Sequence, residues 1–210
     1  MATPATAARL AGCIAAPRAD LCLDFVNTLC WRGSPSPTEQ LHGIAEVLAW
    51  SATSGGVEPR LVEALRARWA ARPREADRAF TAAIELRETL HRTFAAVAGS
   101  GVAPPDELAR LNAALARAAP RARMAWRDGA YRWDTVLGPP VAATLLSPVL
   151  WSAADLLAGG RRERVRQCAN PLCRWMFLDD SKGGSRRWCS MSACGNRAKA
   201  HRHYLRRKLT

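Results

Sequence analysis

The sequence lacks the segments that would carry a chain into or across a membrane. Its 210 residues contain no apolar run as long as the roughly eighteen residues that a membrane-spanning helix needs. The alanine-rich start has no Lys or Arg cluster ahead of an apolar core, and Arg9 interrupts it. We therefore expect a disordered tail over residues 1–19 and no membrane association. We also expect a cytoplasmic protein, whose cysteines are kept reduced.

The sequence motifs of common enzymes are missing as well. There is no glycine-rich phosphate loop, no nucleophile elbow, no H-E-x-x-H helix and no paired-carboxylate signature. Nor does the chain contain an internal repeat. These absences favour a binding protein over an enzyme.

Acidic residues are scarce in the last part of the chain only. Residues 161–210 contain 14 Lys and Arg against 3 Asp and Glu, whereas residues 1–160 contain 17 against 15. The pair Gly159-Gly160 separates the two parts and predicts a hinge. A nearly neutral domain followed by a strongly basic module is typical of a nucleic-acid-binding protein. A solvated arginine-rich surface is the alternative, although the first 160 residues are also rich in arginine and yet balanced.

Four of the seven cysteines are regularly spaced within the basic module. Cys168 and Cys173 have four residues between them, as do Cys189 and Cys194, and fifteen residues separate the two pairs. Two tight turns that point their sulfurs inward would form a closed, tetrahedral and therefore structural site for one zinc ion. Two disulfides or four buried thiols are the alternatives. The other three cysteines have no paired spacing, and His201 and His203 are not needed as ligands.

Motifs around these cysteines resemble a known family. Val165-Arg-x-Cys, Phe177-Leu-Asp, Arg186-Arg-Trp-Cys-Ser-Met and Cys194-Gly-Asn-Arg-x-Lys together are similar to the CGNR zinc finger of bacterial proteins. The resemblance covers about the last fifty residues. It implies a finger over 161–210, zinc ligands at all four cysteines, and a role in transcription regulation.

The segment Leu-Asp-Phe-Val-Asn-Thr (23–28) resembles the start of the ABATE domain, which usually precedes a CGNR finger. This looser likeness covers residues 20–160 and implies a stress-linked regulator. Hydrophobic spacing in this part predicts helices. We expect them from about residue 20, after a cap at Thr38, from Pro59, from Pro73, from Pro105, and over 141–157 with a kink at Pro148.

The fold class that we predict is mainly α. Asp128-Gly129 between alternating aromatic segments indicates one β-hairpin in the helical domain. The finger is expected to be treble-clef-like, with a strand over 174–178, a turn at 182–185 and a returning strand over 186–188. A helix follows from Cys194. Trp175, Phe177, Leu178 and Trp188 would form the finger's small core, and base stacking by either tryptophan is the alternative.

The basic side chains of the finger are the predicted contacts to double-stranded DNA. A helix of this charge fits the major groove. The predicted contacts are Arg186, Arg187, Arg197, Lys199, Arg202, His203, Arg206 and Arg207. Asn196 and Arg197 have an equal alternative, which is to bond loop carbonyls and fix the second pair of cysteines.

Several polar residues lie in apolar segments of the helical domain. They are Asp24, Asn27, Thr28, Arg87 and His91. They either satisfy one another and anchor helices, or line a pocket for a small effector. The sequence thus predicts a zinc-dependent DNA-binding regulator whose first domain senses an effector or forms a homodimer. An RNA-binding module, or a protein-interaction or small-molecule-binding protein with a structural finger, is the alternative.

Overall fold

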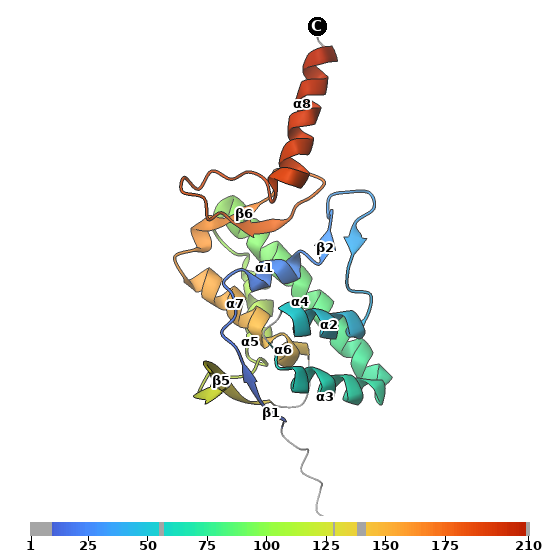
Figure 1. Ribbon diagram of the computed structural model, residues 1–210, viewed down its shortest axis with the longest axis vertical. Coiled ribbons are helices and arrows are strands. Elements are labelled where there is room, and N and C mark those ends of the chain that lie inside the picture. The colour runs from blue at the N-terminus through green and yellow to red at the C-terminus, as the bar shows by residue number, and fades with distance from the viewer. Residues whose placement is uncertain (1–9, 55–56, 128, 138–141, 209–210) are drawn as a thin grey trace, which may run out of the picture.

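A computed structural model of the chain describes residues 10–54, 57–127, 129–137 and 142–208. It is mostly helical, as expected, and it contains three small sheets (Figure 1). The helices are α1 (Leu21–Val26), α2 (Ile44–Ser54), α3 (Pro59–Ala70), α4 (Pro73–Ser100), α5 (Pro105–Leu115), α6 (Ala142–Leu145), α7 (Ser147–Ala158) and α8 (Asn196–Lys208), with a 3₁₀ turn η1 (Arg162–Arg164) and a π turn η2 (Met191–Gly195). The strands are β1 (Leu10–Ile14), β2 (Leu29–Cys30), β3 (Thr38–Glu39), β4 (Met124–Arg127), β5 (Ala130–Leu137), β6 (Val165–Gln167) and β7 (Met176–Leu178).

The 28-residue helix α4 is the longest element, and α1, α2, α3, α5 and α6 all pack against it. It begins at Pro73, where a missing N–H costs nothing, and ends at Gly101, which has a left-handed φ of 79°. Small residues on its buried face, Ala79 and Ala83 among them, let neighbouring helices approach closely, and Phe94 fills the space further along.

The predicted β-hairpin is present. Strands β4 and β5 pair in antiparallel register, with Arg127 opposite Ala130 across a two-residue loop. Gly129 has a φ of 76°, which suits this turn; Asp128 lies outside the described residues. The expectation of disorder over 1–19 differs from the structure at residues 10–14, because β1 pairs with the other edge of β5. The isolated strand gave no signal for a pairing more than a hundred residues away.

Two helix predictions need correction. Thr38 does not cap a helix but lies in β3, which pairs with β2. The carboxylate of Glu39 accepts hydrogen bonds from the N–H groups of Gln40 and Leu41, both at 2.9 Å, so the chain turns there and α2 begins only at Ile44. The predicted helix over 141–157 divides at Leu146 into α6 and α7, with Pro148 in the first turn of α7 instead of at a kink.

The predicted hairpin of the finger is also different. Strand β7 pairs with β6, and residues 186–188 form no strand. The reason is the buried carboxylate of Asp179, which accepts hydrogen bonds from the N–H and hydroxyl of Ser181 and from the N–H of Arg186. The chain therefore wraps around this side chain and runs on to Cys189 instead of returning along β7.

The finger shares the core of the helical domain. Val165, Met176 and Leu178, from β6 and β7, belong to the same buried cluster as Phe25 and Leu90 of α1 and α4. Among the described residues, no helix is both long and apolar enough to span a bilayer.

Candidate metal centre and basic helix

The four predicted cysteines converge on one point. Their Sγ atoms all lie within 4.8 Å of one another, with 3.7 Å between Cys173 and Cys189 and 3.8 Å between Cys189 and Cys194. Four sulfurs at about 2.3 Å from a tetrahedral zinc ion stand about 3.8 Å apart. A disulfide would need about 2.05 Å, so these are free thiols with the spacing of a metal shell.

The first cysteine pair lies on a turn organised by Asn170. Its side-chain oxygen accepts a hydrogen bond from the N–H of Leu172 at 3.1 Å, and its backbone oxygen accepts from Cys173 at 2.9 Å. Arg174 then adopts a φ of 55°, which reverses the chain so that Cys168 can donate its N–H to Trp175 at 2.8 Å. The side-chain amide of Asn170 also points at the Sγ of Cys194, 3.5 Å away. Both sulfurs of this pair therefore face the second pair.

The second pair is closed by a single π-helical turn. The Ser190 backbone oxygen accepts hydrogen bonds from the N–H groups of Cys194 and Gly195, at 3.1 and 3.0 Å. The Ser190 hydroxyl caps the same turn by accepting from Ala193. Helix α8 starts directly afterwards, so Cys194 lies at the positive end of its dipole.

The protonation of these thiols shows why a cation suits the site. Burial raises the pKa of Cys173 to about 12, and burial together with the neighbouring Cys173 and Cys168 raises that of Cys189. Burial alone would also raise the pKa of Cys168, but backbone N–H donors from Cys189 and Asn170 bring it below its usual range. Four thiolates this close repel one another unless a metal ion lies between them. The donor set therefore fits one zinc ion.

Aromatic side chains surround the sulfurs. Phe177 is buried with the cysteines, and Trp175 and Trp188 pack against them half-buried, as the sequence suggested. Leu178, which we had placed in the same cluster, belongs to the main core instead. Trp31 of the helical domain completes the cluster, and nothing in the sequence near it marked it as part of the finger.

Some of the predicted nucleic-acid contacts are engaged within the chain. Arg186 donates to the backbone oxygens of Trp188 and Cys189, and its guanidinium lies 4.5 Å from the centre of the Phe177 ring. Arg197 lies over Trp31 at 4.7 Å, and Arg187 lies over Trp188 at 5.5 Å. The contact of Arg197 with Trp31 is neither of its two predicted roles, DNA contact and bonds to loop carbonyls, and both of these remain predictions.

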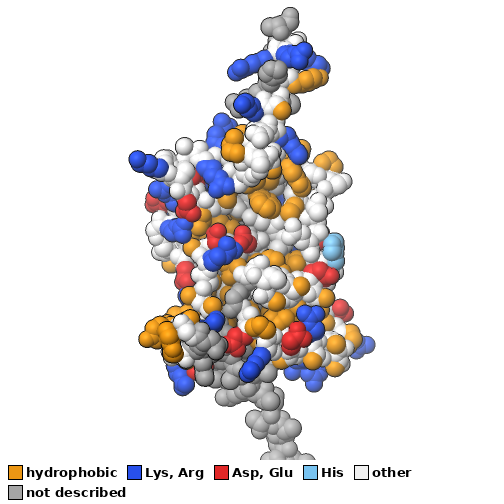
Figure 2. Space-filling view, in the orientation of Figure 1, with side chains coloured by type: hydrophobic (Ala, Val, Ile, Leu, Met, Phe, Trp, Pro, Cys, Tyr) orange, Lys and Arg blue, Asp and Glu red, His pale blue; other side chains and the backbone are white. Residues whose placement is uncertain are grey.

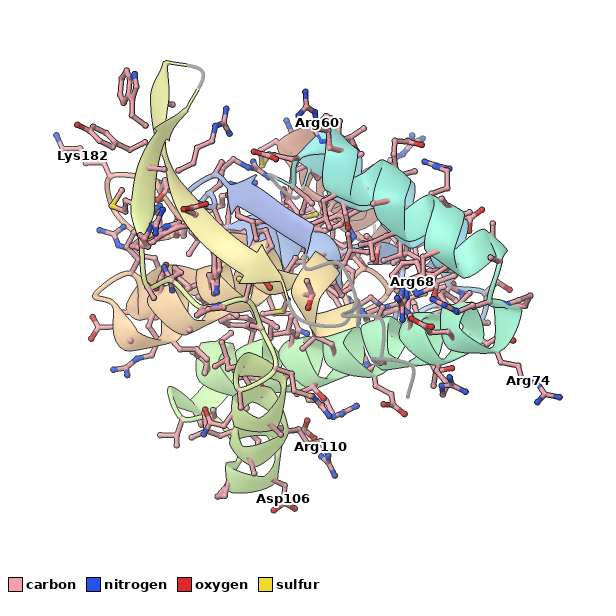
Figure 3. All side chains as sticks on the ribbon, turned by 90° about the horizontal axis from the view of Figure 1, so that it is seen from below. Arg60, Arg68, Arg74, Asp106, Arg110 and Lys182 are labelled. Carbon is pink, nitrogen blue, oxygen red and sulfur yellow. The ribbon has the colours of Figure 1, made fainter. Side chains whose placement is uncertain are left out.

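The other predicted contacts lie on α8, which projects from the rest of the molecule (Figure 1). Lys199, Arg206 and Arg207 are exposed there. The backbone of Arg202 and His203 is helical, whereas their side chains lie outside the described part of the chain. Lys and Arg side chains dominate this helix in Figure 2. In the helical domain, by contrast, Arg60, Arg74 and Arg110 point outward from three different helices and gather on no single face (Figure 3).

Most of the predicted pocket residues have partners within the chain. Asp24 pairs with Arg18, and Asn27 exchanges hydrogen bonds with the backbone of Met176. Thr28 donates to Phe25, and the guanidinium of Arg87 meets Glu39 at 2.6 and 2.8 Å. These contacts agree with an anchoring role, and the effector pocket remains a prediction.

His91 differs from the other four. Its Nε2 atom is buried without a hydrogen-bond partner among the described residues. Burial, helped by the charge of Arg32, lowers the pKa of His91 to about 4, so the ring is neutral near pH 7.

Sequence reasoning missed two residues that build the site. Asp179 organises the loop between the cysteine pairs, and only its place in the Phe177-Leu-Asp motif marked it. Asn170 directs the first turn; an Asn two residues after a ligand cysteine is a turn signal that could have identified it.

A helical domain fused to a four-cysteine finger is the arrangement that comparison with known families also gives. The profile of the ABATE family, described as "Putative stress-induced transcription regulator", matches residues 19–160, and that of the CGNR zinc finger matches residues 164–207. The chain therefore belongs to the ABATE family of transcription regulators and carries a C-terminal CGNR finger. No curated protein matches it.

Proposed function

We propose that this protein is a zinc-dependent DNA-binding transcription regulator. In this proposal the finger contacts double-stranded DNA through α8, and the helical domain senses an effector or forms a homodimer. No catalytic role is assigned. The protein works in the cytoplasm, where reducing conditions keep its cysteines available for metal.

One observation supports DNA contact above all others. Helix α8 carries six Lys and Arg and no Asp or Glu within thirteen residues, and it projects from the body (Figures 1 and 2). Like charges three and four residues apart repel one another along a helix, so this sequence is unfavourable unless an anion compensates. Helices of this diameter enter the major groove, where Arg reads guanine and Lys meets phosphate.

The zinc ion would have a structural role. Cys168, Cys173, Cys189 and Cys194 would hold one Zn²⁺ in a closed shell without an open position for a substrate. Zinc binding would supply folding energy to a segment of few apolar residues and high charge. The same ion would fix the π turn from which α8 starts, and so the direction of the DNA-contacting helix.

The test is duplex DNA binding by the full chain over a salt series, before and after chelation of the metal. A duplex selected from a random pool is compared with a shuffled one. We expect selective, zinc-dependent binding with a log–log salt slope of about −0.9 for each phosphate contacted. Equal binding to all duplexes that fades at physiological salt would contradict the proposal and direct attention to RNA and to protein partners.

A double substitution locates the contact surface. Arg202→Ala with Arg206→Ala should lower the salt slope by about 2 units while zinc content stays unchanged. The matched control is Arg60→Ala with Arg74→Ala, which removes the same charge from exposed positions of α3 and α4 far from the finger (Figure 3). Equal affinity of the two double variants would remove α8 from the DNA contact surface.

A further inference from the structure

A short segment of the helical domain, Asn27–Gly33, lies directly against the finger. Its first residue holds β7: the Asn27 side-chain amide donates to the Met176 backbone oxygen at 2.8 Å, and the Met176 N–H donates to Asn27 Oδ1 at 3.0 Å. This reciprocal pair satisfies both backbone groups of one strand residue. Strand β7 is therefore attached to the helical domain by its backbone as well as by its buried side chains.

The last residue of the segment touches the first cysteine turn. The N–H of Gly33 donates to the Leu172 backbone oxygen at 3.1 Å. A Cβ atom at Gly33 would lie 1.9 Å from the Pro171 backbone oxygen, a contact that no side chain can make. Only glycine lets these two backbones approach so closely.

Trp31 lies between these two contacts and reaches the metal site itself. Its backbone has a φ of 55°, which is unusual for a residue other than glycine and turns the ring toward the finger. The ring packs against the buried cluster of Phe177 and three of the cysteines, and the guanidinium of Arg197 lies 4.7 Å from its centre. Arg197 belongs to the first turn of α8, so one aromatic ring packs on the cluster that holds the cysteines and also contacts the basic helix.

The segment is held on its other side by ion pairs between buried arginines and half-buried glutamates. Arg32 donates to the two carboxylate oxygens of Glu88 at 2.6 and 3.2 Å and to the Val26 backbone oxygen at 3.1 Å. Glu88 also pairs with Arg87 at 2.9 Å, which holds Glu39 in turn. The ion pair between Arg32 and Glu88 therefore fixes the backbone next to Trp31 to helix α4.

We propose that Trp31 is a positioning residue of the finger: it shields the four-cysteine site and sets the direction of α8 through Arg197. The finger then functions as a composite of residues 161–210 and the segment Asn27–Gly33. The consequence for DNA affinity depends on the function proposed above. The consequence for metal retention does not, because it follows from the packing of Trp31 on the cluster that contains the cysteines.

The first test is metal release from the zinc-loaded full chain to the chromogenic chelator 4-(2-pyridylazo)resorcinol. The apolar residues around a metal shell control its access to solvent. We therefore expect Trp31→Ala to release zinc faster than the unaltered chain, by about the 10-fold that loss of a hydrogen-bonded neighbour of the ligands costs. Trp126→Ala is the matched control, since Trp126 is 62% exposed on β4 and belongs to the other end of the molecule. Equal release rates from the two variants would overturn the proposal.

A second pair of variants covers the case in which Trp31→Ala fails to fold. Arg197→Ala removes only the guanidinium above the ring and leaves Trp31 in place. Amide hydrogen exchange should become faster at residues 194–200 in this variant and remain unchanged in Lys199→Ala, another exposed cation of the same helix. Unchanged exchange in Arg197→Ala would show that the stack does not hold α8.

DNA affinity, measured on the same variants, separates the two proposals. Faster zinc release and faster exchange, without DNA binding by any form of the protein, would support the composite finger and contradict the regulator function. Normal DNA binding by Trp31→Ala, with normal zinc release, would leave the regulator function intact and contradict the positioning role.

Discussion

At the scale of single residues, the four cysteines are the most strongly determined feature of the chain. Their spacing alone predicted that they would meet, and the structure brings their Sγ atoms within 4.8 Å. Each cysteine pair needs only one tight turn, so residues that are close in the sequence are enough to predict it. Trp31, which completes the aromatic cluster around the cysteines, comes from more than a hundred positions away and leaves no local pattern.

Removing one cysteine should release the metal. In Cys189→Ser the hydroxyl is a poor zinc ligand, so we expect loss of bound zinc and of the near-ultraviolet circular dichroism of Trp175 and Trp188. Cys22→Ala is the control, because that buried thiol belongs to the core of the helical domain and lies outside the four-cysteine group. One equivalent of zinc in the Cys189 variant, by elemental analysis, would contradict the four-cysteine site.

The carboxyl of Asp179 makes the finger sensitive to acid. Its hydrogen bond with Ser181, together with backbone donors from Arg186 and Ser181, holds its pKa below the usual range. The folded state therefore binds the proton more weakly than the unfolded state. The stabilisation is complete above the unfolded pKa of about 3.9 and is lost as pH falls through the lower, folded pKa.

Asp179→Asn should remove this dependence. The amide cannot accept all the hydrogen bonds that the carboxylate accepts, so the variant should melt at a lower temperature than the unaltered protein near pH 7. This difference in melting temperature should shrink on acidification below about pH 4. Thermal unfolding followed at several pH values measures both effects. A difference in melting temperature that stays constant between pH 3 and 7 would show that the Asp179 charge does not stabilise the finger.

At the scale of elements, the sequence predicted those whose signals are local. Prolines 59, 73 and 105 open α3, α4 and α5, and Gly129 lies in the connection between β4 and β5. The prediction from sequence was wrong for elements whose conformation depends on a residue far away in the chain. Thr38 is drawn into β3 because Arg87, on α4, holds the neighbouring Glu39. Residues 186–188 form no strand because the Asp179 carboxylate holds the preceding loop.

The close approach of Gly33 to the first cysteine turn gives a prediction for one loop. Gly33→Ala places a Cβ 1.9 Å from a backbone oxygen, so the two segments must separate. We expect a loss of about 1–3 kcal/mol in the free energy of unfolding, as for other overpacked sites. Urea unfolding of the zinc-loaded protein measures it. Gly160→Ala is the control, because a Cβ there meets no atom within 4 Å.

At the scale of the whole molecule, the helical domain and the finger share one core. Val165, Met176 and Leu178 are buried among residues of α1, α4 and α7, so the glycine pair at 159–160 does not separate two independent bodies as a hinge would. β6 and β7 lie against α4, whereas α8 projects from the body (Figure 1).

A fragment should therefore be a poor substitute for the full chain. Residues 161–210 alone would expose Met176 and Leu178 and lose Trp31 above the cysteines. We expect the fragment to bind zinc at least about 10-fold more weakly than the full chain, in competition with a chelator. A chain that begins at residue 20 retains the segment Asn27–Gly33 and is the control. Equal affinity of fragment and full chain would show that the finger folds by itself.

The contact between Gly33 and the first cysteine turn also limits how this protein can be rebuilt. Fingers are commonly regarded as cassettes that can be cut at a linker and grafted onto another protein. Here the boundary suggested by the glycine pair is the wrong place to cut, because part of the finger is encoded about 130 residues upstream. A chimera would have to transfer both stretches together, and recombination that separates them would produce a basic tail instead of an oriented helix.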